Sequence, residues 1–147
     1  KKFTFIAESS IYQTNPLLDR DQPHFYNQVL FYQTTINDPF LILKIVNEIE
    51  RKIGRVKDIT RPKGPRVIDI DIIFYNDLKI ESDLLTIPHR SFCERNFVLI
   101  PLCEIIDDIQ KNDKIVNEKG EFKKIMEIYK IRDFIKINSE QKVEKLF

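Results

Sequence analysis

Two aspartates inside an apolar segment are the residues of this sequence best placed to do chemistry. Asp69 and Asp71 lie two positions apart in the run VIDIDIIFY at 67–75, which predicts a β-strand with both carboxylates on one face. Carboxylates this close repel each other unless a cation lies between them. Mg²⁺ is commonly held by one or two carboxylates together with substrate phosphates. The pair therefore indicates a metal-phosphate site, and the alternative is a solvated face of the sheet.

A basic segment directly before the strand favours the first of these interpretations. Residues 51–66 carry seven positive charges and one negative charge, and Gly54 and Gly64 bracket most of the segment. A cationic loop with glycine hinges suits a lid that closes on phosphates, because arginine and lysine both bind phosphate oxygens. A solvated basic loop is the alternative. The segment lacks the pattern GxxxxGK[ST], so it is not a Walker A loop.

A histidine and an aromatic–amide pair are the other candidates. His89 stands beside Arg90 and close to Arg95, where it could donate a hydrogen bond to phosphate. Phe25 and Asn27 share one face of a predicted strand and could stack on, and hydrogen-bond to, a flat heterocycle. Core packing is the alternative for Phe25, and a surface or core position is the alternative for the histidine.

One helix is predicted more sharply than any other element. Asp38 is a good N-cap, Pro39 suits the first helical position, and Gly54 is a typical stop. Between them, apolar residues recur at helical spacing and form one stripe. The stripe comprises Ile42, Ile45, Val46, Ile49 and Ile53.

The remaining elements predict an α+β fold. In chain order they are one or two strands within 3–14, a loop at 15–23, a strand at 25–36, the strand at 67–75, a turn at Asn76 and Asp77, a short strand near 78–80 that pairs back, a helical stretch at 91–106 broken by Pro101, and a last helix at 121–136. Helices do not alternate strictly with strands. This order favours an α+β sandwich over a doubly wound parallel sheet.

Composition limits the class of protein. The chain has 147 residues, with 24 Lys and Arg against 23 Asp and Glu, and 42% of its residues are hydrophobic. These values are typical of one globular domain and exclude a disordered chain. A net charge of +1 gives no whole-molecule case for binding nucleic acid or a membrane, and no apolar run reaches the ~18 residues of a membrane span. Two cysteines without CxxC spacing fit a reducing, cytoplasmic location.

Several motifs together resemble one family, the 6-hydroxymethyl-7,8-dihydropterin pyrophosphokinases of folate biosynthesis. The segments that carry the resemblance come in the family's order and spacing. They are SSIYQTNPL at 9–17, DQPHFYN at 21–27, IE at 49–50, GRV at 54–56, GPRVIDIDI at 64–72, LTIPH at 85–89 and ERNFVLIPL at 94–102.

The resemblance implies a fold, a reaction and cofactors. The fold is a ferredoxin-like α+β sandwich, a mostly antiparallel sheet with helices packed on its faces. The reaction transfers a diphosphate from ATP to the hydroxymethyl group of the pterin and releases AMP. Asp69 and Asp71 would hold two Mg²⁺ ions, and Arg55 and Arg66 would act during the transfer. ATP and the pterin would be the small-molecule substrates, and we expect no nucleic-acid or membrane partner.

The resemblance also assigns residues to the two substrates. The positions that match nucleotide contacts are Asn47, Glu50, Lys57, Ile72, Thr86, His89, Arg90 and Arg95. The positions that match pterin contacts are Thr14, Asn15, Pro16, Leu17, Phe25, Asn27 and Phe97.

The chain departs from the family pattern in three places. It begins at about the family's second strand, so the N-terminal strand, Gly-Ser-Asn loop and helix are expected to be missing. Lys63 stands where many members have a tryptophan. The third departure is a tail beyond about residue 138, the family's usual end. We therefore expect a pyrophosphokinase domain over 1–138, followed by a charged tail or linker over 139–147. The tail could join this domain to a further folate-pathway enzyme in a multifunctional chain.

Three other functions remain open at this point. A ferredoxin-like nucleic-acid-binding module would use the basic loop and the aromatic strand residues, but the paired aspartates would repel its phosphates. A D-x-D nucleotide-sugar transferase would be longer than this chain. A degenerate homologue without catalytic activity would keep the motifs and lack turnover.

Overall fold

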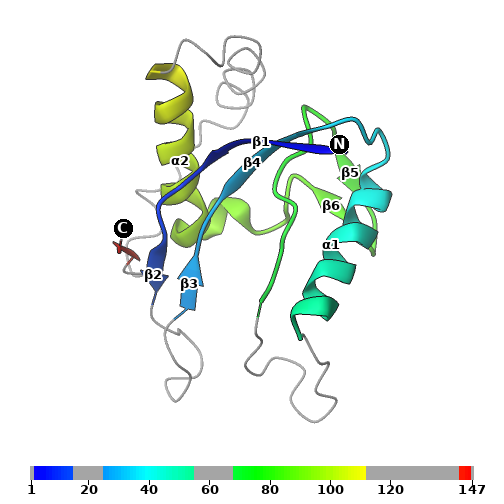
Figure 1. The fold of residues 1–147 in the computed structure, drawn as a ribbon, viewed down its shortest axis with the longest axis horizontal. Coiled ribbons are helices and arrows are strands. Elements are labelled where there is room, and N and C mark those ends of the chain that lie inside the picture. Colours follow the sequence, from blue (N-terminus) through cyan, green and yellow to red (C-terminus); the bar gives the residue numbers. More distant parts are fainter. Residues whose placement is uncertain (1, 15–24, 55–67, 112–142, 147) are drawn as a thin grey trace. The chain divides into compact units, whose positions relative to one another are not determined.

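The computed structural model describes residues 2–14, 25–54, 68–111 and 143–146 (Figure 1). The chain divides into two compact units. The first unit consists of Lys1–Thr34 with Arg90–Phe147, and the second consists of Thr35–His89. The predicted loops at 15–23 and 55–66 and the predicted helix at 121–136 lie outside the described residues.

An antiparallel ribbon of two strand pairs forms the sheet structure of the first unit. The strand β1 (Phe3–Glu8) pairs with β4 (Leu30–Thr34), and β2 (Tyr12–Thr14) pairs with β3 (Phe25–Asn27). Figure 1 shows β1 leading into β2, with β3 leading into β4 beside them. The prediction of one or two strands within 3–14 is confirmed, and the structure has two. The strand predicted over 25–36 is instead two strands.

The break between the strand pairs is held by hydrogen bonds. The Ser9 amide donates to the Val29 carbonyl at 2.9 Å, and the Val29 amide donates to Ser9 Oγ at 2.9 Å. The Gln28 side chain also donates to the Ser9 carbonyl at 2.9 Å. Ser9 is buried, so these bonds satisfy polar groups that water does not reach. The two segments of the ribbon are therefore joined to each other at the point where the strand pairs are interrupted.

The sheet of β2 and β3 has a third strand, which comes from the segment predicted to be a charged tail. The strand β7 (Val143–Lys145) runs antiparallel to β2, with Lys145 opposite Tyr12 and Val143 opposite Thr14. The sheet order is β3-β2-β7, so β2 is the central strand.

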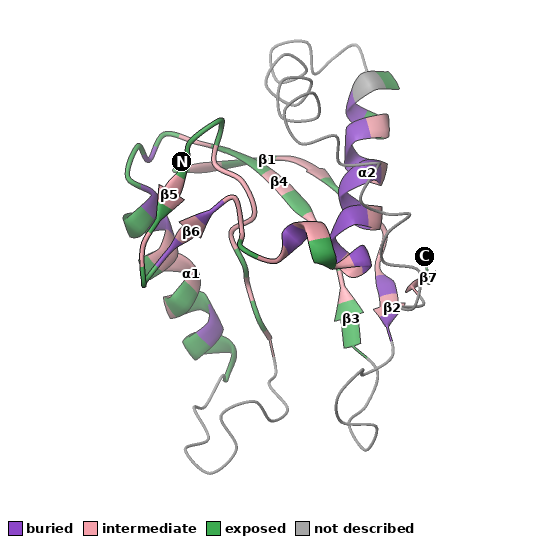
Figure 2. Ribbon diagram, turned by 180° about the vertical axis from the view of Figure 1, so that it is seen from behind, coloured by how far each residue is buried: buried purple, intermediate pink, exposed green. Residues whose placement is uncertain are grey.

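The core of the first unit lies on one long helix, α2 (Asn96–Lys111), which follows a short 3₁₀ turn, η1 (Phe92–Glu94). Figure 2 shows buried residues along most of α2. The side chains that are almost completely buried on this helix are Leu99, Ile105, Ile106 and Ile109.

The prediction that Pro101 breaks the helix was wrong, because α2 continues through it. A proline inside a helix costs about 3 kcal/mol, since it removes a hydrogen bond and crowds the preceding turn. Each buried Leu or Ile side chain contributes about 1.5–3 kcal/mol. Four such side chains on the same helix outweigh the cost of the proline, which is itself fully buried.

The second unit begins with the helix that the sequence predicted. The helix α1 (Pro39–Ile53) has Asp38 as its N-cap, whose side chain accepts a hydrogen bond from the Phe40 amide at 2.9 Å. It ends at Gly54, whose φ of 106° is in the left-handed region that favours glycine. Both predicted ends are confirmed. The predicted apolar stripe is buried at Ile42, whereas Ile53 at its other end is 48% exposed.

The prediction of a strand over 67–75 was wrong for the described residues 68–75, to which no strand is assigned. The bonds that hold this segment are individual contacts rather than a ladder. The Ile70 amide donates to a helix carboxylate, and the Ile73 carbonyl accepts from the His89 amide at 3.0 Å. Among the described residues, this apolar alternating sequence has no neighbouring strand assigned to it, and a ladder requires one.

A turn and a small hairpin complete the second unit. The turn at Asn76 and Asp77 is confirmed. The short strand predicted near 78–80 begins only at its last residue, in β5 (Ile80–Glu81). It pairs forward with β6 (Thr86–Ile87) and not back to 67–75, so that pairing was wrong.

The described residues thus form a mixed α/β structure with antiparallel sheets and two α-helices. This agrees with the predicted α+β class. Neither helix is long and apolar enough to cross a membrane.

We expect Leu99→Ala to destabilise the first unit strongly, because Leu99 has no exposed surface and truncation leaves a cavity. Such changes cost about 2–5 kcal/mol. The same change at Leu84, which is 78% exposed, should cost less than about 0.5 kcal/mol. Urea unfolding of both variants measures the difference. Equal losses would contradict the assignment of α2 as the core.

Candidate functional site

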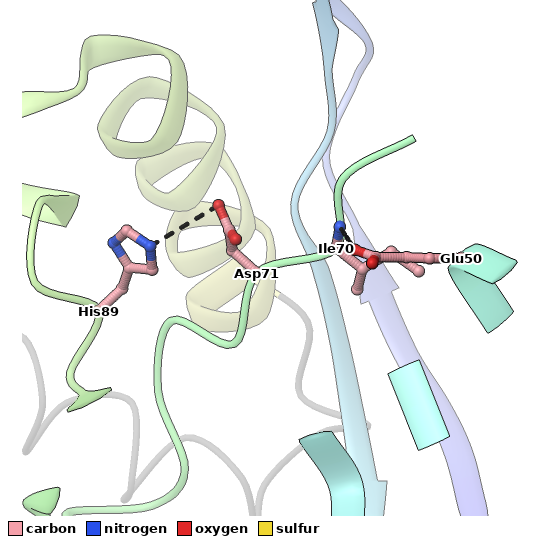
Figure 3. A network of polar contacts seen from close by, with 4 residues as sticks. All are labelled: Glu50, Ile70, Asp71 and His89. Carbon is pink, nitrogen blue, oxygen red and sulfur yellow. Dashed lines mark hydrogen bonds and ion pairs between the residues drawn. The ribbon is translucent and has the colours of Figure 1, made fainter. Parts of the chain in front are cut away.

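A buried glutamate on α1 contacts the backbone between the two candidate metal ligands. Glu50 is only 4% exposed, and its Oε1 accepts a hydrogen bond from the Ile70 amide at 2.7 Å (Figure 3). The sequence places Ile70 between Asp69 and Asp71. A bond from an amide to a carboxylate is stronger than one between neutral groups. Glu50 therefore fixes the backbone from which both aspartates project.

The two aspartates themselves are exposed. Asp69 and Asp71 are both exposed, whereas Ile68 and Ile70 are half-buried. This alternation is the one that a shared face requires, even though the segment is not a strand. The carboxylates are therefore open to a cation or to a phosphate that a cation carries.

His89 lies beside this acidic pair. Its Nε2 is 3.7 Å from Asp71 Oδ2, a distance within the range of an ion pair and longer than a hydrogen bond (Figure 3). The His89 amide also donates to the Ile73 carbonyl. The peptide bond between Ile87 and Pro88, directly before it, is cis. The structure thus brings two predicted site residues together from segments 18 positions apart.

The donor set suits a hard cation that also binds substrate. Among the described residues, no group of three or more His, Cys, Asp and Glu side chains could hold a metal ion. Two carboxylates are nevertheless enough for Mg²⁺, because it keeps several waters and takes its remaining ligands from phosphates. Asp69 and Asp71 fit that requirement, since both are exposed.

Three other predicted nucleotide residues of the second unit lie within three positions of Glu50, Asp71 or His89 in the sequence. Asn47 is exposed on α1, one turn before Glu50, and Ile72 is half-buried next to Asp71. Thr86 is half-buried on β6, and its hydroxyl donates to the Ser82 carbonyl at 3.4 Å.

The predicted pterin residues that the structure describes all belong to the first unit. Thr14 is almost completely buried, and its Oγ1 accepts a hydrogen bond from Asn27 Nδ2 at 3.1 Å. Phe25 lies opposite Thr14 in the β2–β3 register and is 46% exposed. An aromatic ring exposed to this extent is not part of the core, so the core-packing alternative for Phe25 is wrong.

An arginine and an aromatic ring from the predicted site also meet in the first unit. The guanidinium carbon of Arg95 lies 5.5 Å from the centroid of the Phe97 ring, which is a cation–π contact. Arg90, by contrast, is exposed. Six predicted site residues lie outside the described part of the chain: Asn15, Pro16, Leu17, Arg55, Lys57 and Arg66.

Sequence reasoning missed one polar cluster, formed by Ser10, Tyr12 and Glu104. Glu104 on α2 accepts hydrogen bonds from both of the other residues. One signal could have found it, because Glu104 is a single acidic residue inside the apolar run FVLIPLCEII at 97–106. A carboxylate in such a run needs donors from another element.

The exposed carboxylate pair is suited to a protein that handles phosphate through a metal ion, because Mg²⁺ bound by one or two carboxylates takes further ligands from phosphates. Comparison with known sequences narrows this class. Residues 1–107 match the family model of the 7,8-dihydro-6-hydroxymethylpterin-pyrophosphokinases. The match covers more than half of the chain, so the chain belongs to this family, a family of diphosphotransferases, and the resemblance stated above is confirmed.

Individual relatives agree with the family assignment. The chain is 40% identical over 108 residues to the 2-amino-4-hydroxy-6-hydroxymethyldihydropteridine pyrophosphokinase of Bacillus subtilis, covering 74% of this chain and 63% of that protein. It is 44% identical over 101 residues to the folic acid synthesis protein fol1 of Schizosaccharomyces pombe, covering 69% and 13%. It is 40% identical over 109 residues to a mitochondrial folate synthesis bifunctional protein of Arabidopsis thaliana, covering 74% and 19%. The chain spans less than two thirds of the length of each of these relatives.

We expect Glu50→Ala to speed hydrogen exchange at the Ile70 amide by about tenfold, because the amide loses its carboxylate acceptor. Glu50→Gln keeps an oxygen acceptor and should have a smaller effect. Glu48→Ala is a suitable control, since Glu48 lies on the same helix and pairs with Arg51 at 3.9 Å. Unchanged exchange at Ile70 in Glu50→Ala would show that Glu50 does not hold this segment.

Proposed function

We propose that the chain catalyses the Mg²⁺-dependent transfer of a diphosphate from ATP to the hydroxymethyl group of 6-hydroxymethyl-7,8-dihydropterin, with release of AMP. The observation that carries the proposal is the exposed pair Asp69 and Asp71. Glu50 accepts a hydrogen bond from the backbone between the two aspartates, and His89 lies within ion-pair distance of Asp71. Membership of the pyrophosphokinase family supports the choice of reaction.

The reaction needs charge neutralisation more than covalent catalysis. The hydroxymethyl oxygen bonds to the β-phosphorus of ATP, the bond from that phosphorus to the oxygen of AMP breaks, and the hydroxyl proton passes to solvent. Both reactants carry electron-rich oxygens, so positioning and electrostatic stabilisation dominate. Bound Mg²⁺ would supply positive charge next to the phosphates. Asp69 and Asp71 would hold it, and Glu50 would keep their backbone in place.

The remaining residues of the proposed site divide between the two substrates. His89 would donate to a phosphate oxygen, and Arg95 would add positive charge. Arg55 and Arg66 would neutralise charge during the transfer, helped by Lys57. The nucleotide would also contact Asn47, Ile72, Thr86 and Arg90. The pterin would lie against Phe25, Asn27, Phe97 and the backbone of residues 14–17.

The exposed ring of Phe25 supports the pterin side of the proposal. A flat heterocycle can stack on an aromatic face, and the Asn27 amide lies on the same strand two residues away. The Asn27 side chain already donates to Thr14, so its orientation is fixed before a ligand arrives.

We further propose the fold and the cellular setting of the protein. The antiparallel sheets and two helices are compatible with a ferredoxin-like sandwich, to which β7 at 143–145 adds a strand. Relatives named as bifunctional folate synthesis proteins support a place in a multifunctional chain. The chain has only two cysteines, Cys93 and Cys103, without CxxC spacing, and this supports a reducing, cytoplasmic location.

The direct test is AMP release from ATP and Mg²⁺ with and without 6-hydroxymethyl-7,8-dihydropterin, measured on the purified protein. We expect AMP only when the pterin is present, because the hydroxymethyl oxygen is the attacking group. Mass spectrometry should find the pterin diphosphate in equal amount. Absence of pterin-dependent AMP from the folded protein would overturn the proposal. Salt-dependent RNA or DNA binding without Mg²⁺ would then favour a nucleic-acid-binding module.

We expect Asp69→Ala and Asp71→Ala each to lower pterin-dependent AMP release by at least about 100-fold, because each removes a carboxylate that would hold Mg²⁺. Both residues are exposed, so the free energy of unfolding should change by less than about 0.5 kcal/mol. Mg²⁺ or Mn²⁺ titration should also show weaker binding. Asp83→Ala, an exposed aspartate of the same unit, is the control. Full turnover in both site variants would contradict the metal assignment.

A further inference from the structure

A single carboxylate joins α2 to the central strand of the first unit. Glu104 Oε1 accepts hydrogen bonds from the Ser10 amide at 2.9 Å and from Ser10 Oγ at 2.6 Å. Glu104 Oε2 accepts a hydrogen bond from the Tyr12 hydroxyl. The contacts join residues more than 90 positions apart in the chain. Both carboxylate oxygens of Glu104 are therefore used to hold β2 and the residues just before it.

The charge of Glu104 strengthens this contact. Burial by itself would raise the pKa of Glu104, but the hydrogen bonds from Ser10 and Tyr12 and the nearby Lys145 outweigh burial and lower the pKa. Burial and the contact with Glu104 raise the pKa of Tyr12 well above its usual range. At neutral pH, Glu104 is therefore an anion and Tyr12 keeps its proton, so the hydroxyl donates to a charged acceptor.

The anchored strand leads directly to the proposed pterin site. Tyr12 and Thr14 are two residues apart on β2 and are both buried, so they share one face. Tyr12 is opposite Asn27 in the β2–β3 register, and the Thr14 side chain accepts from the Asn27 side chain. Any displacement of β2 at Tyr12 therefore moves both Thr14 and Asn27.

We propose that Glu104 is a positioning residue for the pterin site: it anchors β2 to α2 and so fixes the orientation of Thr14 and Asn27. The inference rests on the proposed function, because it takes these two residues as pterin contacts. Glu104 does not touch the pterin and acts through Ser10 and Tyr12.

The expected size of the effect follows from the population of the anchored strand. The apparent affinity for a ligand falls by the fraction of molecules in the competent conformation. Losing one hydrogen bond to a charged group shifts such an equilibrium by about tenfold or more. Pterin affinity should therefore fall when Glu104 is changed. ATP affinity should not, since most proposed nucleotide contacts belong to the second unit.

The test compares Glu104→Gln with Asp108→Asn. Asp108 is exposed on the same helix one turn later, and the control removes an equal charge without removing the hydrogen bonds to β2. Calorimetry gives the Kd of ATP, and the Kd of the pterin is measured with a saturating non-hydrolysable ATP analogue. We expect Glu104→Gln to raise the pterin Kd about tenfold or more, with less than a twofold change for ATP. Asp108→Asn should change neither. Hydrogen exchange at the Ser10 amide should speed up only in Glu104→Gln.

Other outcomes separate the inference from the proposed function. An unchanged pterin Kd, or equal losses for pterin and ATP, would overturn the positioning role while leaving the function in place. A wild-type protein that binds no pterin would overturn both. Should Glu104→Gln fail to fold, Ser10→Ala and Tyr12→Phe each remove one donor and keep the carboxylate. Each should then raise the pterin Kd without changing the ATP Kd, and no change in either would overturn the inference.

Discussion

A carboxylate that folding takes partly or wholly out of water needs hydrogen-bond donors to replace those it has lost, and two carboxylates of the described chain position other segments in this way. Glu50 in the second unit meets it with a backbone amide between the two aspartates. Glu104 in the first unit meets it with an amide and two hydroxyls from the central strand. In both cases the acidic residue lies on a helix and its donors lie on a separate segment. Each carboxylate therefore fixes where a functional segment lies relative to its own helix.

The sequence predicted elements whose ends depend on local chemistry. Asp38 and Gly54 set the ends of α1 because capping involves only nearby backbone groups. Pro101 misled the same reasoning, since its cost is local and the burial that offsets it comes from contacts across the unit. The strand prediction for 68–75 was wrong for a related reason. Alternating apolar residues predict the face a strand would show, but a strand exists only where a neighbour completes its ladder.

In the candidate site, too, relations within one segment were predictable, whereas contacts between distant segments were not. Asp69 and Asp71 are recognisable because a spacing of two fixes their relation within one segment. The approach of His89 to Asp71 depends on the path of the intervening chain, so spacing alone could not give the distance. Glu50 was expected to contact nucleotide, and the structure adds its bond to the backbone at Ile70. The partners of Glu104 lie more than 90 positions away, beyond the reach of any local pattern.

The paired break at Ser9 and Val29 has a consequence for how the chain can change in length. Side chains on a strand alternate between two faces, so deleting or inserting one residue reverses every position beyond it. A deletion at Ile11 would turn Tyr12 away from α2 and Thr14 away from Asn27. A compensating deletion near Val29 would have to occur at the same time, because hydrogen bonds join Ser9 to Val29 at this point of the ribbon. At this interruption of the ribbon, the chain should therefore tolerate the substitution of a residue better than the gain or loss of one.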